Sequence, residues 1–208
     1  MDIAKVVFSP KCYNETSCNA FENGNTAMLL ESLNGEIGWK AARFDLADAE
    51  GRHFTSEELM SESGLLVAFI CNHCPYVIAI IDRLVQDAKV LQAEGFGVVT
   101  IMSNDYRQVP DDSPDKMRTF AGEHGFTFPY LVDEDQSVAK SYGAVCTPDF
   151  FCLNSAWALQ YRGRLDDAKM ADSSNRSPEL LEAMRLIART GKGPAEQHAS
   201  MGCSIKWH

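Results

Sequence analysis

The sequence has no run of about 18 apolar residues, the length that a membrane-spanning helix needs. A transmembrane helix is therefore excluded. The N-terminal residues also lack a basic start followed by a long apolar segment, so no secretory signal is expected and we predict a cytoplasmic protein. Basic residues are few, since 19 Lys and Arg stand against 29 Asp and Glu and the net charge is -10. Nucleic acids and anionic membranes bind basic surfaces, and neither is an expected partner.

A second C-x-x-C pair is also missing, although the chain has seven cysteines. A zinc site built on two such pairs is therefore not expected. An odd number of cysteines in 208 residues, of which 45% are hydrophobic, argues against the fully paired framework of a small secreted protein. Most of the thiols should be reduced. The cysteines outside the C-x-x-C pair, whose roles the sequence leaves open, are Cys12, Cys18, Cys146, Cys152 and Cys203.

Length and composition fit one α/β domain over residues 1–208, with 1–40 as an N-terminal extension and 191–208 as a C-terminal tail. Apolar periodicity and turn residues predict strands over 65–70, 97–102, 129–132, 149–153 and 158–162, and a hairpin over 44–54. They predict helices over 27–33, 77–91, 114–124, 133–142 and 178–190. Early strand–helix alternation predicts parallel crossovers, and the adjacent late strands predict an antiparallel edge.

The segment 65–77 predicts a redox site. A buried strand ends there in the motif Cys71-x-x-Cys74, and Pro75 precedes a stretch with helical periodicity. A helix N-terminus carries partial positive charge and unpaired N–H groups, so it stabilises a thiolate. In this context a C-x-x-C motif is typical of a thioredoxin-like redox pair. We expect Cys71, at an exposed turn, to be the attacking thiolate and Cys74, one turn into the helix, to be the resolving thiol.

The two residues between the cysteines, Asn72 and His73, are expected to tune the pair. A protonated His73 favours the thiolate and therefore the reduced form, which makes the disulfide more oxidising. The alternative is that His73 only faces solvent. A different alternative for the whole motif is a zinc site, which His53 and Cys203 would complete together with His73.

Thr147-Pro148 is the second expected part of the site. A thioredoxin fold has a cis proline in the loop opposite its disulfide, where the preceding backbone pairs with an extended substrate. Pro148 lies between a predicted helix end and a predicted strand, which fits that loop. The alternative is an ordinary trans turn proline, as most X–Pro bonds are trans. In the first case Thr147 and Pro148 face the substrate.

Several segments together resemble a known family. They are FICNHCPYV (69–77), SND (103–105), DDSP (111–114), FPYL (128–131), CTPDFF (146–151), YRGRLDD (161–167) and GCSIKW (202–207). In this order, over roughly residues 42–207, they resemble the peroxiredoxin-like branch of the thioredoxin-fold superfamily, which is related to alkyl hydroperoxide reductase and thiol-specific antioxidant proteins. The resemblance implies a thioredoxin fold, with a central mixed sheet flanked by helices, and a redox-active disulfide.

The chain departs from true peroxiredoxins at the positions that bind peroxide. Their peroxidatic cysteine follows the pattern Pro-x-x-x-Thr-x-x-Cys, and aligning it with Cys74 puts Val67 at the proline and Cys71 at the threonine. Their peroxide-binding arginine would fall near Cys146-Thr147, which supplies no guanidinium. Without these hydrogen-bond donors we do not expect fast peroxide reduction.

Other features bear on the same site. Leu65 stands near the position of thioredoxin's buried aspartate, so the proton acceptor is either missing or supplied elsewhere. Cys146, beside the Thr147-Pro148 loop, is an auxiliary thiol candidate, although a buried core thiol is the expected role. Cys203 is either a mobile resolving cysteine or part of a tail docked for packing. The aspartates within 111–115 and 166–167 are expected to be solvated surface rather than a cation site.

We therefore expect a thiol–disulfide oxidoreductase in which Cys71 attacks a substrate disulfide and Cys74 resolves the mixed disulfide. No organic cofactor is implied. The partners would be protein or small-molecule disulfides, with a dithiol protein or a small thiol as electron donor. One rival is a hydroperoxide reductase with an antioxidant role, in which one thiol becomes a sulfenic acid. The other is a metal-binding or scaffold protein that keeps the fold without turnover.

Overall fold

The computed structural model describes residues 28–32 and 35–208, so most of the predicted extension, Cys12 and Cys18 lie outside the described residues. The strands are β1 (Leu29–Glu31), β2 (Asp45–Asp48), β3 (His53–Thr55), β4 (Leu65–Phe69), β5 (Gly97–Met102), β6 (Tyr130–Val132), β7 (Cys146–Thr147), β8 (Asp149–Leu153), β9 (Leu159–Gly163) and β10 (Met201–Ser204). The helices are α1 (Ser56–Leu59), α2 (Pro75–Ile78), α3 (Ile81–Ala93), the 3-10 helix η1 (Pro110–Asp112), α4 (Pro114–Glu123), α5 (Ser137–Tyr142) and α6 (Glu179–Thr190).

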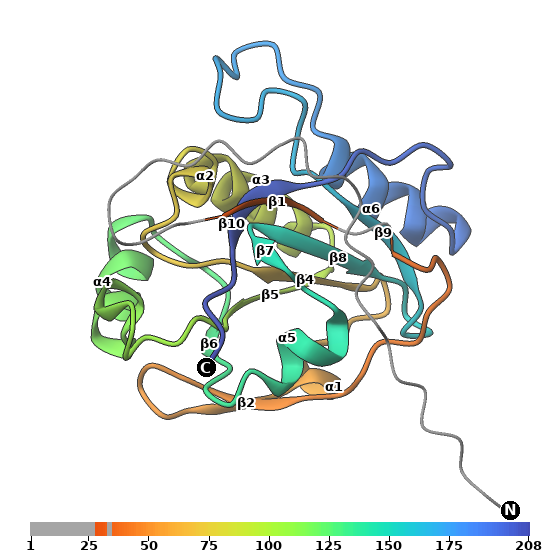
Figure 1. Cartoon of the computed structure of the whole chain (residues 1–208). Helices are drawn as coiled ribbons and strands as arrows, with labels where there is room; N and C mark the ends of the chain where they lie inside the picture. Colours follow the sequence, from red (N-terminus) through yellow and green to blue (C-terminus); the bar gives the residue numbers. More distant parts are fainter. Residues whose placement is uncertain (1–27, 33–34) are drawn as a thin grey trace, which may run out of the picture.

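Seven strands form a mixed sheet in the order β3-β2-β6-β5-β4-β8-β9 (Figure 1). β4, β5 and β6 run parallel to one another, which requires the crossover helices that lie between them in the sequence. β8 pairs antiparallel with β4 and with β9. The predicted parallel crossovers and antiparallel edge are therefore confirmed, as is the hairpin that β2 and β3 form.

Strand β4 is the centre of the fold because alternate residues enter two apolar cores. Leu66 and Ala68 join the core formed with α3 and α6. Leu65, Val67 and Phe69 join the core on the opposite face, which α5 covers. Figure 1 shows α3 and α6 on one side of the sheet and α5 on the other. Every residue of β4 is buried, so the strand is a firmly packed support for the cysteines that follow it.

The helix predicted over 77–91 is present as two helices, α2 and α3. A tight turn at Ala79 and Ile80 separates them, in which the Ile80 N–H donates to the Val77 carbonyl three residues earlier. The Ala79 carbonyl accepts a hydrogen bond of 3.1 Å from the Arg83 guanidinium. Apolar residues keep their spacing through this turn, so periodicity alone did not reveal the break.

A second sheet, in the antiparallel order β1-β10-β7, joins the two ends of the described chain. The helix predicted over 27–33 is wrong, because residues 29–31 form β1. That segment is extended because it pairs with β10 from the other end of the chain, and local sequence patterns carry no information on such a contact. In the register of this sheet, Cys203 of β10 lies between Leu29 and Thr147.

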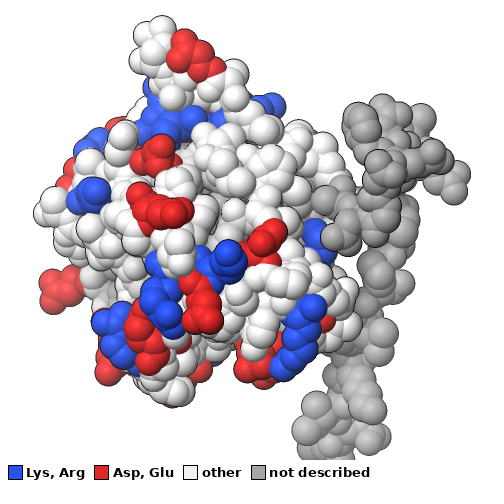
Figure 2. Space-filling view, turned by 90° about the vertical axis from the view of Figure 1, so that its left-hand side faces the viewer, with Lys and Arg blue, Asp and Glu red and all other residues white. Residues whose placement is uncertain are grey.

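Among the described residues, no helix combines the length and apolar character needed to cross a membrane. On the face shown in Figure 2, Lys and Arg side chains lie among Asp and Glu side chains, and that face carries no extended patch of one sign.

Candidate active site

The end of β4 and the start of α2 place the two cysteines of the motif. The Ile70 N–H donates to the Ile101 carbonyl of β5, so the chain remains tied to the sheet up to Cys71. Cys74 is the N-cap residue of α2, and its carbonyl accepts the N–H groups of Val77 and Ile78. Cys74 thus lies at the start of the helix rather than one turn into it. The prediction failed by one turn because the helix begins only at Pro75.

The Thr147-Pro148 loop faces both sulfurs, and its peptide bond is cis, as the sequence predicts. The Cys71 sulfur lies 3.1 Å from the Thr147 hydroxyl oxygen. The Cys74 thiol donates to the Thr147 carbonyl over 3.1 Å. The structure therefore brings Cys71 and Cys74 together with Thr147 and Pro148, although more than 70 residues separate the two pairs in the sequence.

Both sulfurs are covered, which corrects the expectation of an exposed turn. Cys71 is 1% exposed and Cys74 is fully buried. On one side, the Asn72 N–H and side-chain amide donate to Asp112 and to the Asp111 carbonyl, each over 2.8 Å, which fastens η1 to the turn. On the other side lies β7, which β10 extends. These covering segments are distant in the sequence, so the local motif could not reveal them.

A buried carboxylate supports the residues between the cysteines. Asp112 is fully buried, accepts hydrogen bonds from the Asn72 N–H and the Asn104 amide, and lies 2.8 Å from Nδ1 of His73. This carboxylate raises the pKa of His73, against the effect of partial burial. The His73 side chain is 25% exposed, so it lies at the boundary between the core and the solvent. Asp112 is thus a buried carboxylate beside the motif, where the position of Leu65 offers none.

The expectation that the aspartates near residues 111–115 and 166–167 are all solvated surface is wrong for two of them. Asp112 is buried at the site, and Asp166 is 2% exposed and pairs with Arg83 over 2.8 Å. Each carboxylate is held by hydrogen bonds or by a guanidinium, which offsets the cost of removing it from water. A sequence of adjacent acidic residues does not show which of them points inward.

The two thiols of the motif differ in their electrostatic surroundings. Burial, together with the Cys74 sulfur and the Asp112 carboxylate, raises the pKa of Cys71 well above its usual range. The pKa of Cys74 is lowered, because the Cys203 and Cys71 thiols and the backbone of Cys203 and Val77 stabilise its sulfur anion. These opposite directions favour Cys74 over Cys71 as the thiolate of the reduced pair, whereas the sequence alone assigned the attacking role to Cys71.

The remaining described cysteines are free and buried, and they lie in different surroundings. Cys203 of β10 lies opposite Thr147 in the register, and its thiol and backbone lower the pKa of Cys74. The Cys146 thiol is directed at the Pro148 carbonyl, 3.7 Å away, and burial raises its pKa. Cys152 is fully buried within β8, and burial raises its pKa too.

One group of side chains could hold a metal ion. The ligand atoms of Cys71, His73 and Asp112 all lie within 4.8 Å of one another, and thiolate, imidazole and carboxylate are all zinc ligands. Nδ1 of His73 is buried and makes no well-directed hydrogen bond within the described part of the chain, despite its short distance to Asp112. His53 is not part of this group; it pairs with Asp45 in the β2–β3 hairpin.

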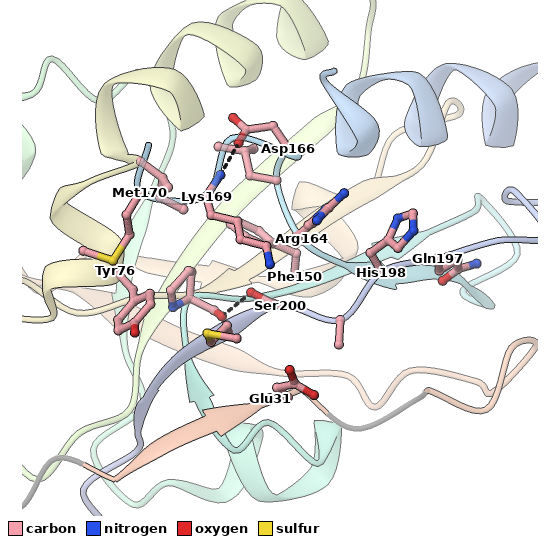
Figure 3. Close-up of a pocket in the computed structure, with 15 residues that line it drawn as sticks. Glu31, Tyr76, Phe150, Arg164, Asp166, Lys169, Met170, Gln197, His198 and Ser200 are labelled. Carbon is pink, nitrogen blue, oxygen red and sulfur yellow. Dashed lines mark hydrogen bonds between the residues drawn. The ribbon is translucent and has the colours of Figure 1, made fainter. Parts of the chain in front are cut away.

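A cavity of about 360 Å³ adjoins the site (Figure 3). Pro148 and Tyr76 line it, so it begins beside the cis-proline loop and the first turn of α2. Its wall is largely apolar, with Phe150 and Met170 among the lining side chains, and Arg164, which also lines it, pairs with Glu179. The Ser200 hydroxyl donates to the Pro148 carbonyl over 2.7 Å, which ties the residues before β10 to the same wall.

Sequence reasoning missed three residues of the site, namely Asn104, Asp112 and Tyr130. Asn104 donates to Asp112 and accepts the Lys206 N–H, each over 2.8 Å, so it links η1 to the segment after β10. The Tyr130 hydroxyl donates to the Asn72 side-chain oxygen over 3.0 Å. All three missed residues lie within the short segments that carry the family resemblance, and that clustering was the available signal.

Comparison with known proteins identifies the family, since residues 37–168 match the AhpC/TSA family. The chain belongs to the AhpC/TSA family. This confirms the resemblance found in the sequence and makes the protein a thiol-dependent redox protein, of the oxidoreductase or peroxidase kind. No curated protein matches the chain.

Three solved structures illustrate what this AhpC/TSA member is similar to. An uncharacterized conserved protein from Geobacillus kaustophilus is 37% identical, with a TM-score of 0.83 over 88% of this chain and 98% of that chain. A hypothetical protein from Sinorhizobium meliloti is 39% identical, with a TM-score of 0.80 over 86% and 98%. The thioredoxin domain of a thiol-disulfide oxidoreductase from Bacteroides vulgatus is 14% identical, with a TM-score of 0.53 over 62% and 89%. The last likeness supports the thioredoxin fold.

Proposed function

We propose that this AhpC/TSA protein is a thiol–disulfide oxidoreductase that uses Cys71 and Cys74 as a reversible dithiol–disulfide pair. The observation that carries the proposal is that both sulfurs contact Thr147. Thr147 directly precedes the cis peptide bond to Pro148, and Cys74 lies at the start of α2. A cysteine at a helix N-terminus can ionise and act as a nucleophile. A residue before a cis proline can pair with the backbone of an extended substrate.

The order of the reaction steps follows from the lowered pKa of Cys74, which makes its sulfur the attacking thiolate. The Cys74 thiolate attacks one sulfur of a substrate disulfide; a Cys74–substrate bond forms, the substrate bond breaks, and the other substrate sulfur leaves as a thiolate that takes a proton from water. Cys71 then gives its proton to the nearby Asp112 carboxylate and attacks the Cys74 sulfur. The second substrate thiolate leaves. The substrate disulfide is reduced, and the pair is oxidised to a Cys71–Cys74 disulfide.

Because Cys71 and Cys74 are buried, a large substrate can reach them only after part of the protein moves. With the sulfurs of Cys71 and Cys74 covered, the segment that lies over Thr147 must shift before a large disulfide can reach them. The apolar cavity beside Pro148 would receive a side chain next to the substrate disulfide. The partners we propose are protein or small-molecule disulfides in the cytoplasm, with a reducing dithiol protein as electron donor and no organic cofactor.

The proposal is tested by the reduction of insulin disulfides with dithiothreitol as donor. The wild-type chain should accelerate the reaction, and Cys74→Ser and Cys71→Ser should each lower the rate of the catalysed reaction by at least about 100-fold. Cys152→Ala, which removes a buried thiol from β8, is the matched control and should retain activity. A wild-type rate no greater than that of dithiothreitol alone, on insulin and on oxidised glutathione, overturns the proposal.

Peroxide reduction is the rival within the AhpC/TSA family. The buried guanidinium nearest in sequence to the proline loop, Arg162, is paired with Asp149 over 2.8 Å, so it is already neutralised by a carboxylate. A peroxide bound at Cys74 would therefore lack this charge. Consumption of hydrogen peroxide in proportion to added protein, together with sulfenic acid at Cys74, would favour the peroxidase instead.

Zinc binding is a second candidate function, which the clustering of a thiol, an imidazole and a carboxylate favours. Cys71, His73 and Asp112 would be the ligands. Stoichiometric zinc in the reduced protein, lost in Cys71→Ser, would support this function. Equal zinc content in the wild-type chain and in Cys71→Ser would rule out a site at these residues.

A further inference from the structure

Strand β10 occupies the place where an extended substrate would pair. In the proposed reaction a substrate backbone lies antiparallel to the residue before the cis proline, Thr147. In this chain β10 pairs antiparallel with β7, and Cys203 lies directly opposite Thr147. The backbones come close at Gly202, where an added Cβ would lie 1.9 Å from the Thr147 carbonyl oxygen. The C-terminal strand thus presents a cysteine as a substrate strand would.

Strand β10 is docked on both sides and is not a loose tail. The Ile205 N–H donates to the Val145 carbonyl over 3.0 Å, and the Ser204 N–H donates to the Met28 carbonyl over 2.8 Å. The Lys206 N–H donates to Asn104 over 2.8 Å. These bonds hold Cys203, which is 7% exposed, against the active site.

Two other thiols belong to the surroundings of Cys74. Cys71 lies three residues before it, and Cys203 lies opposite Thr147, whose carbonyl accepts the Cys74 thiol over 3.1 Å. All three cysteines belong to one apolar cluster. Cys146 is less suited, because its thiol is directed at the Pro148 carbonyl and it lies opposite Ser204 in the register rather than opposite the site.

We propose that Cys203 is a third redox cysteine, which attacks the Cys74 sulfur and competes with Cys71 for it. When Cys74 is bonded to a substrate, Cys203 forms a Cys74–Cys203 bond, the Cys74–substrate bond breaks, and the leaving substrate thiolate takes up the proton that Cys203 loses. When Cys74 is bonded to Cys71, the same attack releases the Cys71 thiolate, which takes up the proton that Cys203 lost. Each exchange conserves electrons, so no additional oxidant is needed. This inference rests on the proposed function, since it needs a disulfide at Cys74.

The test uses oxidised glutathione and the full chain with Cys71→Ser. Attack by Cys74 would give a glutathione adduct, which Cys203 should displace to form a Cys74–Cys203 disulfide. Mass spectrometry after alkylation should find at least about tenfold less adduct on Cys74 in Cys71→Ser than in Cys71→Ser/Cys203→Ala, as thiol exchange within one chain is fast. The matched control, Cys71→Ser/Cys146→Ala, should behave like Cys71→Ser.

The outcomes separate the two proposals. If the wild-type chain forms the Cys71–Cys74 disulfide while Cys71→Ser retains as much adduct as the double variant, Cys203 has no redox role and the proposed function stands. If the wild-type chain forms neither an adduct nor a disulfide at Cys74, the proposed function itself fails. Wild-type protein gives an independent readout that needs no substitution, because a fraction of oxidised chains should carry Cys74 bonded to Cys203. Absence of that species from oxidised wild-type protein and from Cys71→Ser overturns the inference.

Discussion

At the scale of single residues, the contact between His73 and Asp112 is the part of the site with the most direct pH dependence. Asp112 is fully buried and has two further hydrogen-bond donors, so its position is fixed. Its carboxylate raises the pKa of His73, which therefore stays protonated to a higher pH than a free histidine. A group whose pKa is raised by folding stabilises the protein below its unfolded pKa, here about 6.5, and loses that contribution as the pH rises through its folded pKa.

Replacing His73 with Gln should therefore destabilise the protein in a pH-dependent manner. We expect a loss of about 1–2 kcal/mol in the free energy of unfolding at pH 6, where the ion pair between His73 and Asp112 is formed. The loss should shrink toward pH 9. Denaturant unfolding of both chains at several pH values measures the difference. In the Asp112→Asn background the effect of His73→Gln should no longer vary with pH, and NMR should show a lower pKa for His73. An unchanged pKa in Asp112→Asn would remove this coupling.

At the scale of elements, the pairing of β10 with β7 controls access to the sulfurs. The two strands approach closely only because residue 202 has no side chain; a Cβ there would meet the Thr147 carbonyl carbon as well as its oxygen. Gly202→Val should push β10 away from β7 and uncover Cys74. Gly122→Ala in α4, where an added Cβ meets nothing within 4 Å, is the matched control.

The expected result for Gly202→Val is alkylation of Cys74 by iodoacetamide at least about tenfold faster than in the wild-type chain, because a thiolate reacts as soon as it is accessible. Mass spectrometry of the peptide that contains Cys74 gives the rate. Gly122→Ala should match the wild type. If Gly202→Val reacts at the wild-type rate while circular dichroism shows a native fold, β10 does not control access.

The same elements show what local sequence could and could not predict. β4, β5, β8, β9 and α6 were predicted because each is specified by its own apolar pattern and by turn or cap residues. β1 and β10 were missed because each is extended through pairing with a partner at the other end of the chain. For the same reason the motif placed Cys71 and Cys74 near Thr147 and Pro148, but could not show that Asp112 and Cys203 complete their surroundings.

At the scale of the whole molecule, the buried strand β4 supports the redox motif and the strand β10 covers it. β4 is buried on both faces and ends at the redox motif, while β10, paired between β1 and β7, lies beside Thr147 (Figure 1). The main sheet is held by two apolar cores, whereas β10 is held mostly by hydrogen bonds and a few buried side chains such as Ile205. Local opening is therefore expected at β10 before the sheet loses its order.

The account depends on Cys71 and Cys74 exchanging electrons reversibly, and a redox titration of the wild-type chain tests this most directly. Protein is equilibrated in glutathione buffers that range from reducing to oxidising, and free thiols are then alkylated. Mass spectrometry identifies the cysteines that escape alkylation because they are in a disulfide. We predict one intramolecular disulfide per chain that always contains Cys74, with Cys71 as its main partner, and full recovery of both thiols on return to reducing buffer. The account would be contradicted if Cys71 and Cys74 were free thiols, and therefore alkylated, at every potential in native protein.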